Sequence, residues 1–453
     1  MPRSVSLKPS AVETAKIPTA SVLDSLVYNL VHMLPYYLRG LFTPNRFWTG
    51  FWTALHPDPA AVKFVSRLRR KYRSGYIYLR MLTAKSLLIL DRDGIRHVLD
   101  NSPDIYADPK LKRVGMAHFQ PDALTISRGA EWRDRRRFNE AVLDTEQDLH
   151  RYAAAFLDVI RAETVVTLQR AERQLAWDDF AGLFERITLR IIFGSSIDVA
   201  ADASLLYDLR RMMRESNRAF ALRKSKYFDG FYAHLRRARE EAGIASLASV
   251  CQHAPATAMT RIDNQIPHWL FAMADTLAIN TARALALIVS HDDAEARVRA
   301  EMADKDLAAA TGIRGLRYLE GCVQEAMRLW PTTPLLARET LRDDVLGGAT
   351  VPAATQILIL NSFNHRDREN LAYADTFSPQ VWLRDDLDYQ FNHLSNGRQV
   401  CAGKNLALFI ATATLAALLA AHRYTLKGPP LDPRRPLPYL YNHFHIRMSF
   451  DAA

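Results

Sequence analysis

Residues 394–405 read Leu-Ser-Asn-Gly-Arg-Gln-Val-Cys-Ala-Gly-Lys-Asn, an irregular loop that runs directly into the apolar, alanine-rich stretch 406–421. Cys401 therefore lies at the predicted N-terminus of a buried helix. The positive end of a helix and its unpaired N–H groups favour a thiolate, which suits a nucleophile or a metal ligand. Gly397 and Gly403 let the backbone approach a bulky, flat partner closely. Taken alone, the loop favours a cysteine that fills a core position as a small hydrophobe.

A second pattern, Glu325-Ala-Met-Arg328, lies near the end of a helix predicted over 314–330. The spacing of three places the carboxylate and the guanidinium on one helix face as an ion pair. Most pairs of this kind are solvated and contribute little to stability. The Glu325–Arg328 pattern therefore indicates a function only in combination with the other motifs.

The run 268–290 is apolar nearly all round, which predicts a deeply buried helix. Asp275 and Thr276 lie in its middle, and a buried carboxylate is costly unless it is paired or hydrogen-bonded. The small residue Ala272 lets another group pack against the backbone there. The structural alternative is a threonine that bonds the preceding turn and an aspartate that reaches a neighbouring helix.

A fourth pattern, Trp132 and Arg136, follows the turn at 127–129. The two residues are four apart and share a helix face, an arrangement that suits an anionic group held beside an aromatic ring. An arginine-rich solvated face is the alternative.

Together, in this order and at these separations, the four motifs resemble the cytochrome P450 family of haem-thiolate monooxygenases, in its soluble bacterial type. The resemblance extends from about residue 60 to the C-terminus. It implies a mainly α fold with small β-sheets, in which the haem lies between a long central helix and the helix of the cysteine loop.

The resemblance also implies the roles of individual residues. Cys401 would be the proximal ligand of the iron in haem b (iron protoporphyrin IX), with Trp132, Arg136 and Arg338 at the haem propionates. Asp275 and Thr276 would be catalytic and deliver protons to bound O2. The remaining residues expected at the cofactor or bracing the fold around it are Gly397, Arg398, Gly403, Ala272, Glu325 and Arg328.

The sequence departs from the family pattern in four features, which involve five residues. Leu394 replaces an aromatic residue that shields the thiolate, and Gln399 replaces a propionate-binding arginine or histidine. Met273 replaces a frequent glycine and is expected to narrow the oxygen pocket. Gln380 and Val381 stand where Glu-Arg is usual, so the third member of the Glu/Arg network is missing or supplied elsewhere.

The implied activity is insertion of one oxygen atom from O2 into a small lipophilic organic substrate, such as a secondary metabolite or a fatty-acid-like molecule. The sequence carries no fused flavin or iron–sulfur motif, so electrons are expected from a separate ferredoxin or flavodoxin with its reductase. The alternatives are a haem-thiolate peroxygenase, a member that catalyses isomerisation, dehydration or nitration, and a haem-based sensor.

Substrate specificity is expected from residues 101–127 and 195–243. Arginines between 210 and 223 are candidates to meet a substrate carboxylate. Cys251 and Cys322 are expected to be structural, and His443 and His445 to be surface residues on one strand. The side chains that suggest an apolar pocket are Phe119, Met212, Met213, Phe220, Trp269 and Met273.

Composition sets the outer limits. The chain has 453 residues, 49% hydrophobic and 24% charged, which excludes a disordered or fibrous protein. Three cysteines are too few for a disulfide framework and favour a reducing, cytoplasmic location. The net charge of +10 fits an acidic protein partner, whereas nucleic-acid binding is not expected because no aromatic-interleaved basic tract is present.

The organisation of the chain follows from the same patterns. We expect an amphipathic leader over 1–57 and one catalytic domain over 58–453, without a membrane span and as a monomer. Strands are expected at 76–82, 86–90, 355–360 and 443–450. Helices are expected at 60–72, 131–170, 180–193, 205–243, 268–290, 314–330 and 404–421.

Overall fold

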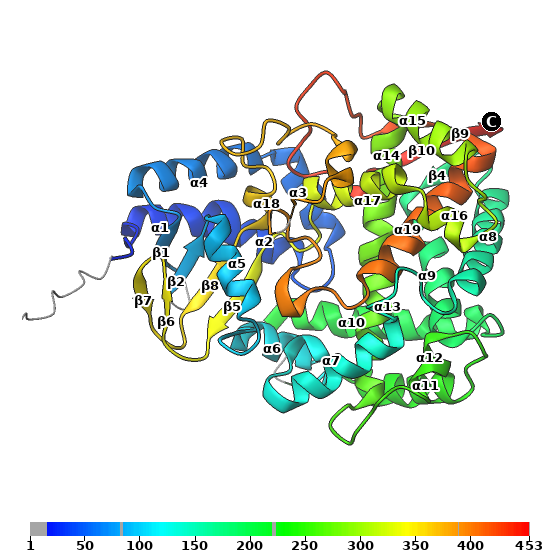
Figure 1. Ribbon diagram of the computed structural model, residues 1–453, viewed down its shortest axis with the longest axis horizontal. Helices are drawn as coiled ribbons and strands as arrows, with labels where there is room; N and C mark the ends of the chain where they lie inside the picture. The colour runs from blue at the N-terminus through cyan, green and yellow to red at the C-terminus, as the bar shows by residue number, and fades with distance from the viewer. Residues whose placement is uncertain (1–15, 82–84, 220–222, 388, 453) are drawn as a thin grey trace, which may run out of the picture.

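The computed structural model describes residues 16–81, 85–219, 223–387 and 389–452. Helices form most of the described chain, and the sheets are small, so the expected fold class is confirmed. In Figure 1 the main sheet lies on the left and the long helices gather on the right.

The main sheet has five strands in the order β1-β2-β8-β5-β3. Strand β2 pairs parallel with β8, and the other pairs are antiparallel. The strands expected near 76–82, 86–90 and 355–360 are present, although residue 82 lies outside the described residues. The bounds are β1 Tyr76–Arg80, β2 Lys85–Ile89, β3 Tyr106–Ala107, β5 Leu336–Thr340 and β8 Gln356–Ile359.

Two further sheets are smaller. One has the order β4-β10-β9, and the other is the hairpin β6-β7, whose turn uses Gly347 and Gly348 at positive φ. The expected strand at 443–450 begins only at Arg447, because residues 443–445 form a 3₁₀ turn. The bounds are β4 Gln174–Ala176, β6 Asp344–Leu346, β7 Ala349–Val351, β9 His422–Gly428 and β10 Arg447–Ala452.

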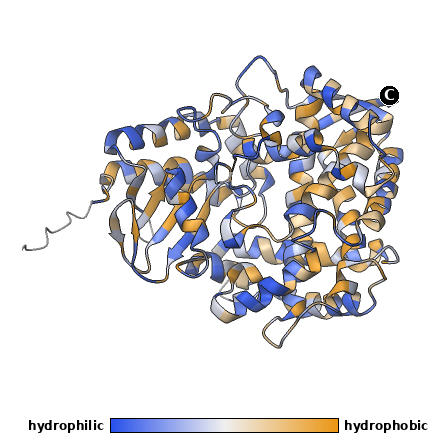
Figure 2. Cartoon of the chain, viewed as in Figure 1, coloured by the Kyte–Doolittle hydropathy of each residue, from blue (hydrophilic) through white to orange (hydrophobic). Residues whose placement is uncertain are grey.

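The helical core is built from α9 (Trp177–Phe193), α14 (Ala278–Val289), α17 (Arg317–Leu329) and α19 (Lys404–Ala421). These helices pack against one another, and Figure 2 shows their apolar character. Two stretches, Ile262–Val289 and Lys404–Ala421, are long and apolar enough to cross a membrane. However, 78% and 67% of their apolar windows are buried inside the protein, as in the core helices of globular proteins.

Two helices expected as single units are divided. Asp144 adopts a left-handed conformation at φ +47° and ends the first half of the expected 131–170 helix. The expected 205–243 helix is also two helices, whereas the expected 314–330 helix is present as the single helix α17, preceded by the short helix α16. The observed bounds are α7 Gly129–Leu143, α8 Ala153–Arg170, α10 Val199–Ala219, α11 Phe228–Glu240, α16 Ala310–Arg314 and α17 Arg317–Leu329.

The central helix, expected over 268–290, contains a π-helical turn. It consists of α13 (Ile266–Phe271), the π turn η4 (Ala272–Leu277) and α14. A π turn inserts one residue and locally interrupts the regular α-helical bonding, and such turns occur frequently at functional sites. The turn contains Asp275 and Thr276.

The N-terminal segment lies against the body of the protein. Its described part contains α1 (Val22–Tyr28), the π turn η1 (Asn29–Met33), α2 (Leu34–Arg39) and α3 (Arg46–Leu55). Residues 1–15 of the expected leader lie outside the described residues. The remaining helices are α4 Asp58–Tyr72, α5 Arg92–Asp100, α6 Lys110–Ala117, α12 Leu247–Cys251, α15 Asp292–Ala303 and α18 Asn361–Asn364.

Candidate active site

The cysteine loop is held in place by a glycine. Gly397 has φ +64°, and a Cβ there would lie 2.3 Å from the carbonyl oxygen of Leu99 at the end of α5. Only glycine fits this position without displacing backbone. The loop then brings Cys401 to the start of α19, and the Cys401 N–H donates to the Leu394 carbonyl at 2.9 Å.

Cys401 is a half-buried residue whose thiol has little contact with solvent. Burial raises the pKa of the thiol, whereas the Gly403 N–H, Arg136 and Lys404 act in the opposite direction. The sequence predicted a favoured thiolate, but burial outweighs the helix terminus. A bound cation would supply the positive charge that stabilises the thiolate. Among the described residues no cluster of three or more His, Cys, Asp or Glu could hold a metal ion.

Trp132 and Arg136 on α7 lie beside this loop. Arg136 donates from Nη1 to the Val400 carbonyl at 2.6 Å and also binds Glu140. The Arg398 guanidinium lies over the Trp132 ring, 5.7 Å from its centroid. The structure therefore brings the Trp132 and Arg136 motif and the cysteine loop together, as the sequence predicted.

Several buried polar atoms near the expected cofactor positions have no hydrogen-bond partner. They include Arg338 Nε on β5 and Gln399 Oε1 in the cysteine loop. Arg338 is 5% exposed, and its Nη1 lies 3.7 Å from Asp108. Because unpartnered buried donors are costly, Arg338 is suited to an additional anionic partner.

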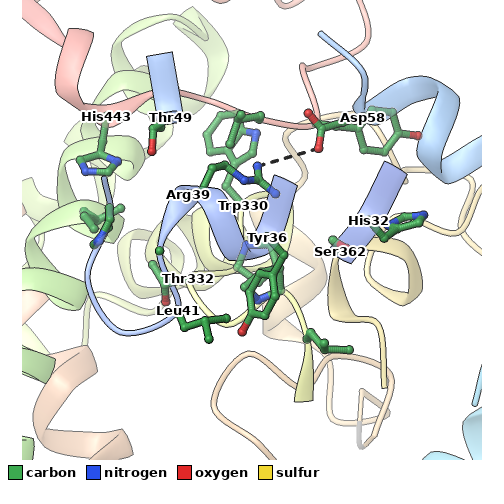
Figure 3. Close-up of a pocket in the computed structure, with 18 of the residues that line it drawn as sticks. His32, Tyr36, Arg39, Leu41, Thr49, Asp58, Trp330, Thr332, Ser362 and His443 are labelled. Atoms are coloured by element: carbon green, nitrogen blue, oxygen red, sulfur yellow. Dashed lines mark ion pairs between the residues drawn. The ribbon is translucent and has the colours of Figure 1, made fainter. Parts of the chain in front are cut away.

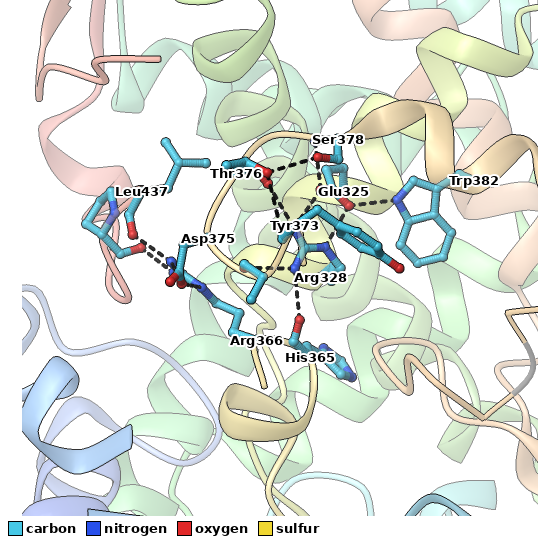
Figure 4. Close-up of polar contacts among 12 residues, drawn as sticks. Glu325, Arg328, His365, Arg366, Tyr373, Asp375, Thr376, Ser378, Trp382 and Leu437 are labelled. Carbon is cyan, nitrogen blue, oxygen red and sulfur yellow. Dashed lines mark hydrogen bonds and ion pairs between the residues drawn. The ribbon is translucent and has the colours of Figure 1, made fainter. Parts of the chain in front are cut away.

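Glu325 and Arg328 form a fully buried ion pair, both 0% exposed (Figure 4). Two charge-assisted bonds join them, Nε to Oε2 at 2.8 Å and Nη2 to Oε1 at 2.6 Å. The solvated alternative for this motif is therefore excluded. Arg328 also donates to four backbone carbonyls, those of His365, Tyr373, Ala374 and Thr376.

The third member of this network is a tryptophan. Trp382 Nε1 donates to Glu325 Oε2 at 2.9 Å, and the Ser378 N–H donates to Oε1 at 2.9 Å. Gln380, at the family's usual acidic position, is exposed, and Val381 is buried. The missing Glu-Arg pair is thus replaced by an indole and a backbone amide.

Asp275 lies in the π turn, and its carboxylate faces Arg210 of α10. Arg210 donates to its carboxylate from Nε at 2.9 Å and from Nη2, and Arg210 Nη1 binds Glu185. The alternative of an aspartate that reaches a neighbouring helix is therefore correct in geometry. Because Arg210 binds Asp275 and Glu185, its guanidinium is occupied within the protein. Arg210 is therefore not placed to bind a substrate carboxylate, the role for which the sequence made it a candidate.

Thr276 lines two adjoining cavities. They measure about 200 and 510 Å³, and the smaller is drawn in Figure 3. No hydrogen bond of the Thr276 hydroxyl occurs within the described part of the chain, so the expected bond to the preceding turn is absent. Both cavities also have walls from the N-terminal segment, through Met33, Tyr36, Leu41 and Phe42.

The predicted pocket residues are only partly correct. Phe119 lines the larger cavity. Met212, Met213, Trp269 and Met273 are buried in the main core and line neither cavity, so Met273 does not narrow them. Phe220 lies outside the described residues.

Other sequence expectations meet mixed outcomes. Cys251 and Cys322 are buried and unpaired, as expected of structural residues. His443 is not a surface residue: it is 3% exposed and lines the smaller cavity, and only His445 is exposed. Arg39, Arg283 and Trp382 were not predicted as site residues from the sequence. A lone arginine in the apolar run 277–289 was the available signal for Arg283.

Comparison with known proteins identifies the family. The family model described as Cytochrome P450 matches residues 203–440, slightly more than half of the chain. The chain therefore belongs to the cytochrome P450 family, and the family implies a haem iron cofactor and oxidoreductase chemistry.

Individual relatives are distant. A cyclooctat-9-en-7-ol 5-monooxygenase of Streptomyces melanosporofaciens is 28% identical over 344 residues, 68% of this chain and 73% of the relative. A carnosic acid synthase of Rosmarinus officinalis is 28% identical over 169 residues, 35% of this chain and 33% of the relative. A nicotine N-demethylase of Nicotiana tabacum is 29% identical over 170 residues, which are 35% of this chain and 33% of the relative. The match thus spans about a third of the plant relatives' length.

Proposed function

We propose that this protein is a haem-thiolate monooxygenase that inserts one oxygen atom from O2 into a small lipophilic substrate. One observation carries the proposal: Cys401 lies three residues before the start of α19, and α19 packs against the π turn η4 that bears Asp275 and Thr276. A sulfur ligand and a proton-carrying pair on two packed helices are the arrangement this chemistry needs.

The residues present fit haem b. Cys401 would hold the iron, because it offers a soft donor whose burial favours pairing with a cation. Arg338, with its unpartnered Nε, would meet one propionate. Trp132 and Arg136 lie beside the loop, Arg398 lies within it, and these residues would meet the other. Gly403 and Ala272 would leave room for the cofactor, whereas the space beside Gly397 is occupied by the backbone of Leu99, so the expected cofactor role of Gly397 is replaced by packing of the loop against α5. When bound, the haem supplies the oxygen chemistry.

The protein's own contribution is proton delivery and exclusion of water. The Thr276 hydroxyl faces the cavities and is available to donate a proton to a bound molecule. Asp275 lies next to it, with its carboxylate held by Arg210. When Arg210 releases this carboxylate, Asp275 becomes free to accept a proton from solvent and pass it toward Thr276.

Electrons come from a separate protein. The net charge of +10 supports an acidic ferredoxin or flavodoxin with its reductase, since charge complementarity steers such encounters. The Streptomyces relative supports assignment to the soluble bacterial type. The unpaired cysteines support a cytoplasmic protein, which we assign as a monomer without a membrane span or nucleic-acid partner.

The proposal is tested by reconstituting the purified holoprotein with ferredoxin, its reductase and NADPH. Lipophilic compounds are first screened for a change in the haem absorption spectrum, and hits are assayed for product. Substrate-dependent consumption of NADPH and O2 with oxygenated product is expected. Turnover with peroxide alone would favour the peroxygenase. Binding of carbon monoxide and O2 without substrate-dependent NADPH consumption would favour the sensor.

A further inference from the structure

The smaller cavity lies between the N-terminal segment and the central helix (Figure 3). Tyr36 and Leu41 form part of its wall on the N-terminal side, and Ile279 and Trp330 form part of the opposite wall. These walls are largely apolar or aromatic, so the few charged groups that reach the cavity stand out.

Four charged residues line this cavity: Arg39, Asp58, Asp275 and Arg283. Asp58 lies 3.9 Å from Arg39, and Asp275 is held by Arg210 on α10. Each carboxylate at the cavity therefore has a guanidinium within 4 Å, although Asp58 Oδ2 has no hydrogen-bond partner in the described part of the chain.

The positive charge of Arg283, in contrast, has no carboxylate beside it among the described residues. It is 6% exposed, and it donates to two backbone carbonyls, from Nη1 to Trp330 at 2.9 Å and from Nη2 to Tyr441 at 2.8 Å. Its Nε has no hydrogen-bond partner, and no carboxylate of the described residues lies within 4 Å of it. Burial, with a smaller contribution from Arg39, lowers its pKa to about 9, which leaves it charged at neutral pH. A buried, unbalanced charge is costly unless a counter-ion joins it.

His443 lines the same cavity and is also unpartnered. It is 3% exposed, and neither ring nitrogen has a hydrogen-bond partner. Burial first, and then Arg283, hold its pKa well below the ordinary value. The ring is therefore neutral at pH 7 and presents one N–H donor and one acceptor.

We propose that Arg283, assisted by His443 and Arg39, binds the carboxylate of a lipophilic substrate. This inference rests on the proposed monooxygenase function and names the substrate class of the same site. A carboxylate matches the planar guanidinium and supplies the missing counter-ion, while the apolar walls accept a hydrocarbon body.

The position of the anchor also bears on where the substrate is oxidised. Thr276, Ile279 and Arg283 follow at helical spacing and all face the cavity. At 1.5 Å per residue, Arg283 lies about 10 Å along the helix from Thr276. Beyond Thr276 the larger cavity continues, lined by Met116, Phe119 and Leu358. A substrate held by its carboxylate at Arg283 therefore presents carbons remote from that group at Thr276.

The test is calorimetric binding of dodecanoate and dodecanol to the holoprotein, its Arg283→Met variant and a control, Arg299→Met. Arg299 serves as the control because it also donates to two backbone carbonyls, at 3.1 Å each, and lines neither cavity; unlike Arg283, it has a carboxylate partner, Glu295. The parent should bind dodecanoate at least tenfold more tightly than dodecanol, because a hydrogen bond to a charged group contributes about 1.5–3 kcal/mol.

Arg283→Met should lose that preference, and Arg299→Met should keep it. Should Arg283→Met fail to fold, Arg39→Met, at the rim of the cavity, should weaken dodecanoate binding several-fold. Equal affinity of the parent for the two ligands, or unchanged dodecanoate binding by the Arg283 or Arg39 variant, would overturn the inference. The proposed function is tested separately by the haem spectrum and the product assay. Those assays can therefore contradict the monooxygenase function while the carboxylate preference is confirmed, or confirm the function while the preference is absent.

Discussion

Replacing Glu325 with glutamine removes one charge from the buried pair and leaves Arg328 without a counter-ion. Both side chains are 0% exposed, so water cannot compensate. Removal of one partner of a buried ion pair costs about 3–5 kcal/mol. At about 2.1 cal/mol/K per residue, the unfolding entropy of a chain of this length is about 1 kcal/mol/K. Glu325→Gln should therefore lower the melting temperature by about 3–5 °C.

Two further variants calibrate this result in the same thermal melt. Trp382→Phe removes one hydrogen bond to the carboxylate and should lower the melting temperature by about 1.5–3 °C. Gln380→Ala alters the exposed residue at the family's acidic position and should change it by no more than about 0.5 °C. If Gln380→Ala is as damaging as Trp382→Phe, then Gln380 rather than the indole completes the network, and the reasoning is refuted.

Three other predictions concern the loop, acid stability and proton delivery. Gly397→Ala should lower the free energy of unfolding more than Gly129→Ala does. Both glycines have positive φ, but only Gly397 has backbone atoms within 4 Å of the added Cβ. Equal losses of unfolding free energy in denaturant melts would contradict this. Burial raises the pKa of Asp144, but hydrogen bonds from Arg151 and the electrostatic effect of the nearby His150 outweigh it, so the folded pKa lies below the ordinary value. Asp144 therefore stabilises the fold at neutral pH, and this contribution is lost as the pH falls from about 4 through the folded pKa. The melting temperatures of Asp144→Asn and the parent should become equal in that pH range. A difference in melting temperature that does not change with pH would contradict a stabilising Asp144–Arg151 ion pair. Thr276→Ala should lower product formed per O2 consumed by about 10²-fold, and Thr276→Ser should restore it; no recovery with serine would show that the hydroxyl is not the proton donor.

Local composition was sufficient for the elements that decide the family. The helix expected at 404–421 is observed with the same bounds, because an unbroken apolar run follows a glycine. The buried Glu325–Arg328 pair and the neighbourhood of Trp132, Arg136 and Cys401 also match what the motif order implied.

Other features depend on contacts between distant segments. The π turn at Ala272–Leu277 lies in an apolar run without glycine or proline, and its packing against α9 and α19 is invisible in local sequence. Trp382 reaches Glu325 only because the chain returns across α17. The thiol of Cys401 has a raised pKa because tertiary burial outweighs the helix terminus.

Ligation of haem iron by Cys401 is tested most directly by the ferrous–carbon monoxide spectrum of the purified protein. The parent and a Cys251→Ser control should both show the red-shifted Soret band of a thiolate-ligated haem, and Cys401→Ser should lose it. An unchanged carbonyl spectrum in Cys401→Ser, or a parent that takes up no haem when precursor is abundant, would contradict the assignment.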